Sequence, residues 1–169
     1  FDHIICRFVL QHLRIENKNQ IAITELFRVL KPGGTLLVIE ADGLMKNLYP
    51  QSKFLRSCMT KLDQHGPVDL EIGRKINAML CTAGFEPPAW KTQTCDCSGS
   101  SLEEEVTLMA ERLESAKSFF NSFFGNDDEA SRFCEEYLRQ LQSPESTYNF
   151  TKFLVTGKKP ITTKMRVAK

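Results

Sequence analysis

Two short, continuous apolar runs stand near the start of the chain, at residues 4–6 and 36–39. Runs of this kind are typical of strands buried on both faces of a parallel sheet, whereas half-exposed strands alternate between apolar and polar residues. Between the two runs, apolar residues recur every three or four positions, which places them on one stripe of a helix. The members of that stripe are Ile23, Leu26, Phe27 and Leu30. The pattern predicts a strand, a helix ending at the Lys-Pro-Gly-Gly sequence of residues 31–34, and a second strand.

Both predicted strands lead into segments that contain polar residues, within residues 7–12 and 40–42. A crossover of this length between parallel strands is expected to be right-handed, and ligands of such sheets bind beyond the carboxyl ends of the strands. We therefore expect any functional site to lie at these two segments.

The next part of the chain alternates between helical and extended patterns. Apolar spacing predicts a helix from Pro50 to about residue 65 and another over residues 72–83, with Gly84 as the residue that ends it. Residues 85–94 are then expected to form a strand that begins irregularly at Pro87 and Pro88.

A helical segment is predicted at about residues 98–146, with one helix from residue 101 to about 124 and a second from about 128 to 142. Residues 148–156 include apolar residues at both odd and even positions, and so on both faces of a strand. This pattern favours a closing strand between two others. Residues 158–169 are polar and are expected to form a tail.

These segments resemble the class I S-adenosylmethionine-dependent methyltransferases. The resemblance lies in residues 2–13, in Arg-Val-Leu-Lys-Pro-Gly-Gly at 28–34, in the strand ending Glu-Ala-Asp at 40–42, and in residues 73–85. It covers roughly residues 1–95 and 147–157. It implies an α/β fold: a partial Rossmann-like methyltransferase sheet of strands four to seven, the last antiparallel, with a helical hairpin inserted at about 98–146. Residues 1–157 would then be the carboxyl-terminal half of such a domain.

The resemblance also implies a reaction and a cofactor. The intact protein would transfer a methyl group from S-adenosyl-L-methionine to a small-molecule acceptor. In-line displacement at a sulfonium needs mainly correct positioning of the two reactants, which can supply about 7–11 kcal/mol. A general base is worth a further factor of about 10²–10⁴ where the acceptor must lose a proton.

In this family, the end of strand four often touches the methionyl part of the cofactor, and the matching residues here are Cys6 and Arg7. A guanidinium beside a sulfonium is repelled, so we expect the Arg7 backbone to face the cofactor and its side chain to reach a carboxylate. The alternative is a surface arginine that pairs with Glu40 or Asp42.

His12 is the candidate catalytic residue, because an imidazole titrates near neutral pH and can act as a general base. The alternative is a histidine that only caps the start of a helix. Gln11 could orient the substrate. Glu40 and Asp42 end the second strand and could line the substrate side, although carboxylates at strand ends are commonly just solvated.

No Gly-x-Gly sequence occurs anywhere in the chain. The family holds its cofactor with a glycine-rich turn after strand one and an acidic residue after strand two. We therefore expect a missing amino-terminal half or a partner chain to supply these parts. The chain alone is expected to bind S-adenosylmethionine negligibly and to be inactive.

Two other functions stay open. The chain could act as it stands, as a non-catalytic partner or as half of a split assembly. A nicotinamide-binding Rossmann enzyme shares this kind of sheet but is disfavoured by the match in strands four to seven.

Composition narrows the possible partners. The net charge is +1, and no apolar run approaches the roughly 20 residues that cross a bilayer, so neither nucleic acid nor a membrane is expected as a partner. Six cysteines without a disulfide framework favour a reducing, cytoplasmic compartment. Cys95 and Cys97 have the wrong spacing for a zinc site, and no metal is expected.

Overall fold

The computed structural model describes residues 1–97 and 99–161 of the chain. The chain divides into two compact units. The first, here called the sheet unit, contains residues 1–42, 67–93 and the segment from 151 onward. The second, here called the helical unit, contains residues 43–66 and 94–150.

The sheet unit has the mixed sheet of an α/β fold. Strands β1 (His3–Arg7) and β2 (Thr35–Asp42) run parallel, and helix α1 (Lys18–Val29) connects them. Strand β5 (Thr147–Lys158) is antiparallel to β2, and β4 (Ala89–Cys97) pairs with β5. The closing strand therefore runs antiparallel and lies between two others, as predicted.

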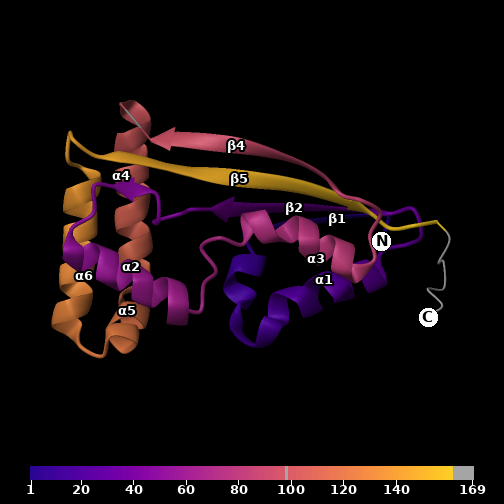
Figure 1. Cartoon of the computed structure of the whole chain (residues 1–169), viewed down its shortest axis with the longest axis horizontal. Helices are drawn as coiled ribbons and strands as arrows, with labels where there is room; N and C mark the ends of the chain where they lie inside the picture. The colour runs from indigo at the N-terminus through magenta and orange to yellow at the C-terminus, as the bar shows by residue number, and fades with distance from the viewer. Residues whose placement is uncertain (98, 162–169) are drawn as a thin grey trace. The chain divides into compact units, whose positions relative to one another are not determined.

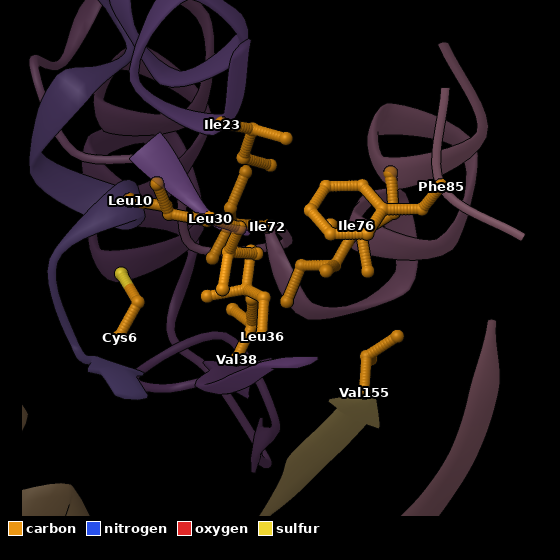
Figure 2. Packing of buried hydrophobic residues seen from close by; sticks show 11 residues of the cluster. Cys6, Leu10, Ile23, Leu30, Leu36, Val38, Ile72, Ile76, Phe85 and Val155 are labelled. Atoms are coloured by element: carbon orange, nitrogen blue, oxygen red, sulfur yellow. The ribbon is translucent and has the colours of Figure 1, made fainter. Parts of the chain in front are cut away.

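One face of this sheet is covered by α1 and α3 (Ile76–Ala83), which lie side by side (Figure 1). Their apolar stripes meet side chains from alternate positions of β2 and β5, and the resulting core is mainly aliphatic, with Phe85 at one side (Figure 2). Its fully buried members include Ile23, Leu36, Val38, Ile76 and Leu80. Gly84 ends α3 with a φ of 101°, a left-handed conformation that favours glycine, as the sequence predicts.

The opposite face of β1 is open within the sheet unit. Ile5 is 69% exposed, and β1 pairs with β2 alone among the described strands. Strand β1 is therefore an edge strand with an apolar residue facing outward.

The helical unit is assembled from four helices and one short strand. They are β3 (Leu48–Tyr49), α2 (Lys53–His65), α4 (Ser100–Ser115), α5 (Lys117–Phe124) and α6 (Asp127–Leu141). Helix α6 packs against α2, α4 and α5, and β3 pairs with the start of β5 (Figure 1). Its centre is aromatic: Phe133 contacts Phe120, Phe124 and Tyr137.

The helix predicted from residue 101 to about 124 is two helices in the structure. Ala116 has a φ of −95° and a ψ of 6°, which ends α4 before α5 begins. The insertion predicted as a hairpin of two helices therefore contains three. The break lets the phenylalanines of the short α5 pack on α6, a tertiary contact that helical periodicity does not reveal.

Other boundaries also differ from prediction. Helix α2 starts at Lys53, not Pro50, because the Ser52 side chain accepts a hydrogen bond from the Leu55 amide and so caps the helix there. Strand β4 starts at Ala89 because Pro87 and Pro88 have no amide hydrogen to donate.

Of the expected tail, Lys158 belongs to β5, and residues 162–169 lie outside the described residues, as does residue 98 of the expected insertion. Among the helices of the described ranges, none has both the length and the apolarity that a membrane crossing requires.

Candidate functional site

The carboxyl ends of β1 and β2 lie side by side in the sheet unit, as predicted. Arg7 is in register with Ile39, and the next amide, that of Phe8, donates to the Ile39 carbonyl at 2.9 Å. The polar residues at the carboxyl ends of both strands therefore gather at one end of the sheet, which is called the edge below.

Glu40 is fully buried at this edge. Its Oε1 accepts hydrogen bonds from the backbone amides of Val9 at 2.8 Å and Leu10 at 2.6 Å. The other oxygen, Oε2, is buried without a hydrogen-bond partner among the described residues. Burial raises the pKa of the Glu40 carboxyl, and the amides of Leu10 and Val9 oppose that shift. The side chain that we expected on the substrate side is thus turned onto the backbone after β1.

The chain leaves β1 through a backbone conformation that is unusual for a side-chain-bearing residue. Phe8 has a φ of 53°, and the 3-10 turn Leu10–Leu13 begins two residues later. Left-handed backbone at a non-glycine residue is unfavourable and persists only where surrounding contacts hold it. The two hydrogen bonds to Glu40 are such contacts.

Asp42 is 4% exposed and is bound to Arg74. Its Oδ1 accepts from Arg74 Nη2 at 2.6 Å and Nε at 3.0 Å, and its Oδ2 accepts from the Arg74 amide at 3.0 Å. The preceding residue, Gly73, packs so tightly that a Cβ there would stand 2.9 Å from Asp42 Cβ and 2.7 Å from Phe153. A carboxylate expected to line the substrate side thus anchors the segment before α3.

The structure does not show the alternative considered for the Arg7 side chain, an ion pair with a carboxylate near the end of β2. Among the described residues Arg7 forms no ion pair with Glu40 or Asp42, and its guanidinium lies 5.0 Å from the centre of the Phe8 ring. Arg74 was not predicted as the partner of Asp42. The available signal was its place beside Gly73, at the start of the family-like segment 73–85.

Gln11 and His12 lie together in the 3-10 turn. The Gln11 amide nitrogen Nε2 is 3.1 Å from His12 Nε2, a hydrogen bond that forms when His12 carries its proton on Nδ1. The Gln11 carbonyl accepts from the Asp69 amide at 2.8 Å, and the Asp69 carboxylate binds Lys75 at 2.6 Å. His12 itself is exposed, so its ring is accessible at this edge.

Cys6 points into the aliphatic core, beneath the edge (Figure 2). Burial raises the pKa of its thiol to about 11, with a further contribution from the nearby charge of Glu40. The thiol is therefore protonated at neutral pH, and any contact of Cys6 with a ligand at the edge would have to come from its backbone.

The fold is α/β, with a mixed sheet and six α-helices among the described residues. The model of the methyltransferase domain family matches residues 1–38, the segment that forms β1, α1 and the first half of β2. The resemblance predicted from the sequence motifs is confirmed over that segment. No curated protein matches the chain.

Several solved structures are similar to this chain. Phosphoethanolamine N-methyltransferase 2 of Haemonchus contortus, in complex with S-adenosyl-L-methionine, is 18% identical over 95% of this chain and 33% of that enzyme, with a TM-score of 0.49. The YcgJ protein of Bacillus subtilis is 18% identical over 95% of this chain and 64% of that one, with a TM-score of 0.48. The cyclopropane synthase MmaA2 of Mycobacterium tuberculosis is 13% identical, with 93% and 55% covered and a TM-score of 0.49.

The chain thus spans about a third of the length of the Haemonchus enzyme. Identities of 13–18% and TM-scores below 0.5 assign neither chemistry nor substrate to this chain, because one fold serves many functions.

Proposed function

We propose that this protein is an S-adenosylmethionine-dependent methyltransferase and that the edge formed by β1 and β2 is one wall of its site. The observation that carries the proposal is the match of residues 1–38 to a methyltransferase domain. That segment contains β1, the turn after it and the first half of β2, and so the candidate residues Cys6, Arg7, Gln11 and His12 but neither Glu40 nor Asp42.

The residues at this edge fit a cofactor in part. S-adenosylmethionine, when bound, supplies an electrophilic methyl group on a sulfonium. The side chains of Arg7 and His12 are exposed at the edge, whereas Glu40 and Asp42 are occupied by protein donors. Arg7 and Cys6 would therefore meet the cofactor through their backbone, which avoids placing a guanidinium against a sulfonium.

His12 is the residue proposed to take a proton from the acceptor. The tautomer that accepts from Gln11 through Nε2 has its lone pair engaged, so His12 must release this hydrogen bond before Nε2 can act as a base. Gln11 would then hold the ring in place until the acceptor arrives. We propose a small-molecule acceptor because a net charge of +1 provides no strong attraction for nucleic acid.

The other wall of the site is proposed to come from a preceding segment or a partner chain. The sequence has no Gly-x-Gly turn to hold the cofactor, and β1 leaves its outer edge and Ile5 uncovered in the sheet unit. An uncovered apolar edge strand is a template for another strand. The same observation favours the second candidate, half of a split assembly, in which the added strand belongs to another chain.

Calorimetry tests the proposed cofactor. The complete protein, expressed from its whole gene, is expected to bind S-adenosylhomocysteine, with NAD as the non-binding control. The chain of residues 1–169 alone is expected to show negligible heat. Micromolar affinity of the chain alone would contradict the proposal that part of the cofactor site comes from another segment or chain. Binding of NAD instead would overturn the proposed function.

Kinetics test His12. We expect His12→Ala in the complete protein to lower kcat by a factor of about 10²–10⁴ with little change in cofactor affinity. His3→Ala is the matched control, because His3 is also exposed but lies at the opposite end of β1. Equal turnover of both variants would leave His12 with no catalytic role.

A further inference from the structure

Glu40 is the carboxylate at this edge that has no cationic partner among the described residues. Asp42 binds Arg74 and Asp69 binds Lys75, but the hydrogen bonds of Glu40 come from backbone amides alone. Removing a carboxylate from water is costly and is tolerated only where donors compensate. The donors found here belong to the turn that follows the neighbouring strand.

These two amides are also the first after the left-handed residue Phe8. A single oxygen of Glu40 accepts from both, so the carboxylate orients two successive peptide units at the start of the 3-10 turn. Gln11 and His12 follow directly in that turn, and Arg7 precedes it. A shift of this backbone would therefore move Gln11 and His12, the candidate residues in the turn after β1.

We propose that Glu40 is a positioning residue, which fixes the turn at residues 8–12 through the amides of Val9 and Leu10 and so sets the placement of Gln11 and His12. This inference rests on the proposed function for its kinetic consequence but not for its structural one. Glu40 acts through backbone it binds and, being fully buried, does not need to touch the substrate.

The alternative is that Glu40 serves stability alone. A purely structural carboxylate would affect unfolding without altering the reaction once the protein is folded. The two roles are separated by measuring local hydrogen exchange, melting temperature and kinetics on the same variants.

Three substitutions at position 40 weaken the hydrogen bonds to the amides of Val9 and Leu10 to different degrees. Glu40→Met replaces the carboxylate by an apolar side chain of similar length and removes the acceptor. Glu40→Gln keeps an acceptor oxygen at the same reach. Glu40→Asp keeps the carboxylate but withdraws it by one methylene, and it provides an intermediate variant if Glu40→Met does not fold. Glu25→Met, at an exposed position on α1, is the matched control.

In the complete protein, we expect Glu40→Met to speed hydrogen exchange at the amides of residues 9 and 10 by about tenfold or more, as for a lost hydrogen bond. Its kcat should fall by about tenfold to a hundredfold through misplacement of the turn. Glu40→Asp should lie between wild type and Glu40→Met, whereas Glu40→Gln and Glu25→Met should stay within about threefold of wild type in both measurements.

The outcomes separate the two proposals. Unchanged exchange at residues 9 and 10 in Glu40→Met, or in Glu40→Asp if only that variant folds, would overturn the positioning role whatever the activity. Faster exchange with unchanged kcat would also overturn it, because the turn would then not matter to the reaction. If wild type neither binds S-adenosylhomocysteine nor transfers methyl groups, the proposed function fails, and exchange alone still decides whether Glu40 holds the turn.

Discussion

The sheet unit and the helical unit stabilise their loops in different ways. In the sheet unit the core is mainly aliphatic, and two carboxylates near the end of β2 hold segments from elsewhere in the chain: Glu40 binds backbone amides after β1, and Asp42 binds Arg74 before α3. In the helical unit the core is aromatic, and phenol groups take that role. The contrast lies in what holds these loops and not in charge as such, because the helical unit also contains ion pairs, such as Arg112 with Glu105 and Lys61 with Glu129.

The phenols of the helical unit meet at one loop residue. Tyr137 donates to the Met45 carbonyl and Tyr148 accepts from the Met45 amide, each at 3.3 Å. Met45 has a φ of 64°, so this loop, like the turn at Phe8, contains left-handed backbone held by buried side chains. Burial raises the pKa of both tyrosines, and Glu105 contributes to the shift, so both hydroxyls stay neutral.

The largest expected effects on stability come from truncating one buried side chain in each core, aromatic and aliphatic. Phe133→Ala should lower the free energy of unfolding by about 3–5 kcal/mol, and Leu36→Ala by about 2–5 kcal/mol, because both side chains are fully buried. Hydrogen exchange should rise most in α5 and α6 for the first variant and in α1 and α3 for the second. Equal increases in all four helices would show that the two cores act as one cooperative unit.

Gly73→Ala tests the close packing beneath the ion pair of Asp42. The new Cβ would stand within 3 Å of Asp42 and Phe153, so we expect a loss of about 1–3 kcal/mol in denaturant unfolding from overpacking. Thr82→Ala, on the exposed side of α3, should change stability by less than about 0.5 kcal/mol. A neutral Gly73→Ala would mean that this segment can move away at no cost.

Tyr148→Phe tests the phenols that hold the loop at Met45. The substitution removes one acceptor from the Met45 amide and should cost about 1 kcal/mol in thermal or urea unfolding. Tyr49→Phe is the control, because Tyr49 is 70% exposed and should tolerate the change. If the two variants are equally stable, the tyrosines do not hold this loop.

The smallest expected effect is a dependence of stability on pH that comes from Glu40. Burial raises its folded pKa above the ordinary value of 4.5, so folding favours the protonated form. The contribution of Glu40 to stability is full below that ordinary value and is lost as pH rises through the folded pKa. Glu40→Gln carries no titrating proton, so its stability relative to wild type should increase in urea unfolding as the pH rises above the ordinary pKa of 4.5. A constant difference would contradict the raised pKa.

Patterns that depend on neighbouring positions in the chain were predictable from the sequence. The period of Ile23, Leu26 and Leu30 predicted α1, and Gly84 ends α3 as expected, because both signals act within a few residues. The break at Ala116 was not predictable. No local signal marks it, and α5 is placed by packing of its phenylalanines on α6.

The candidate site was likewise predictable only in part. The residues after β1 and β2 were expected to share one edge, because the carboxyl ends of parallel strands lie together. The partners of Glu40 and Asp42 were not foreseen. Each is distant in sequence, at residues 9–10 and 74, and each depends on which way a buried side chain turns once the strands have paired.

The order of apolar and polar residues was therefore sufficient for the α/β class, the parallel pair β1 and β2, and the edge at which function is expected. Only the tertiary structure showed that Glu40 binds backbone amides and that Asp42 binds Arg74. The physical reason is that hydrophobic periodicity is a local property of the chain, whereas the partner of a buried charge is chosen by whichever donors the fold brings within about 3 Å of it.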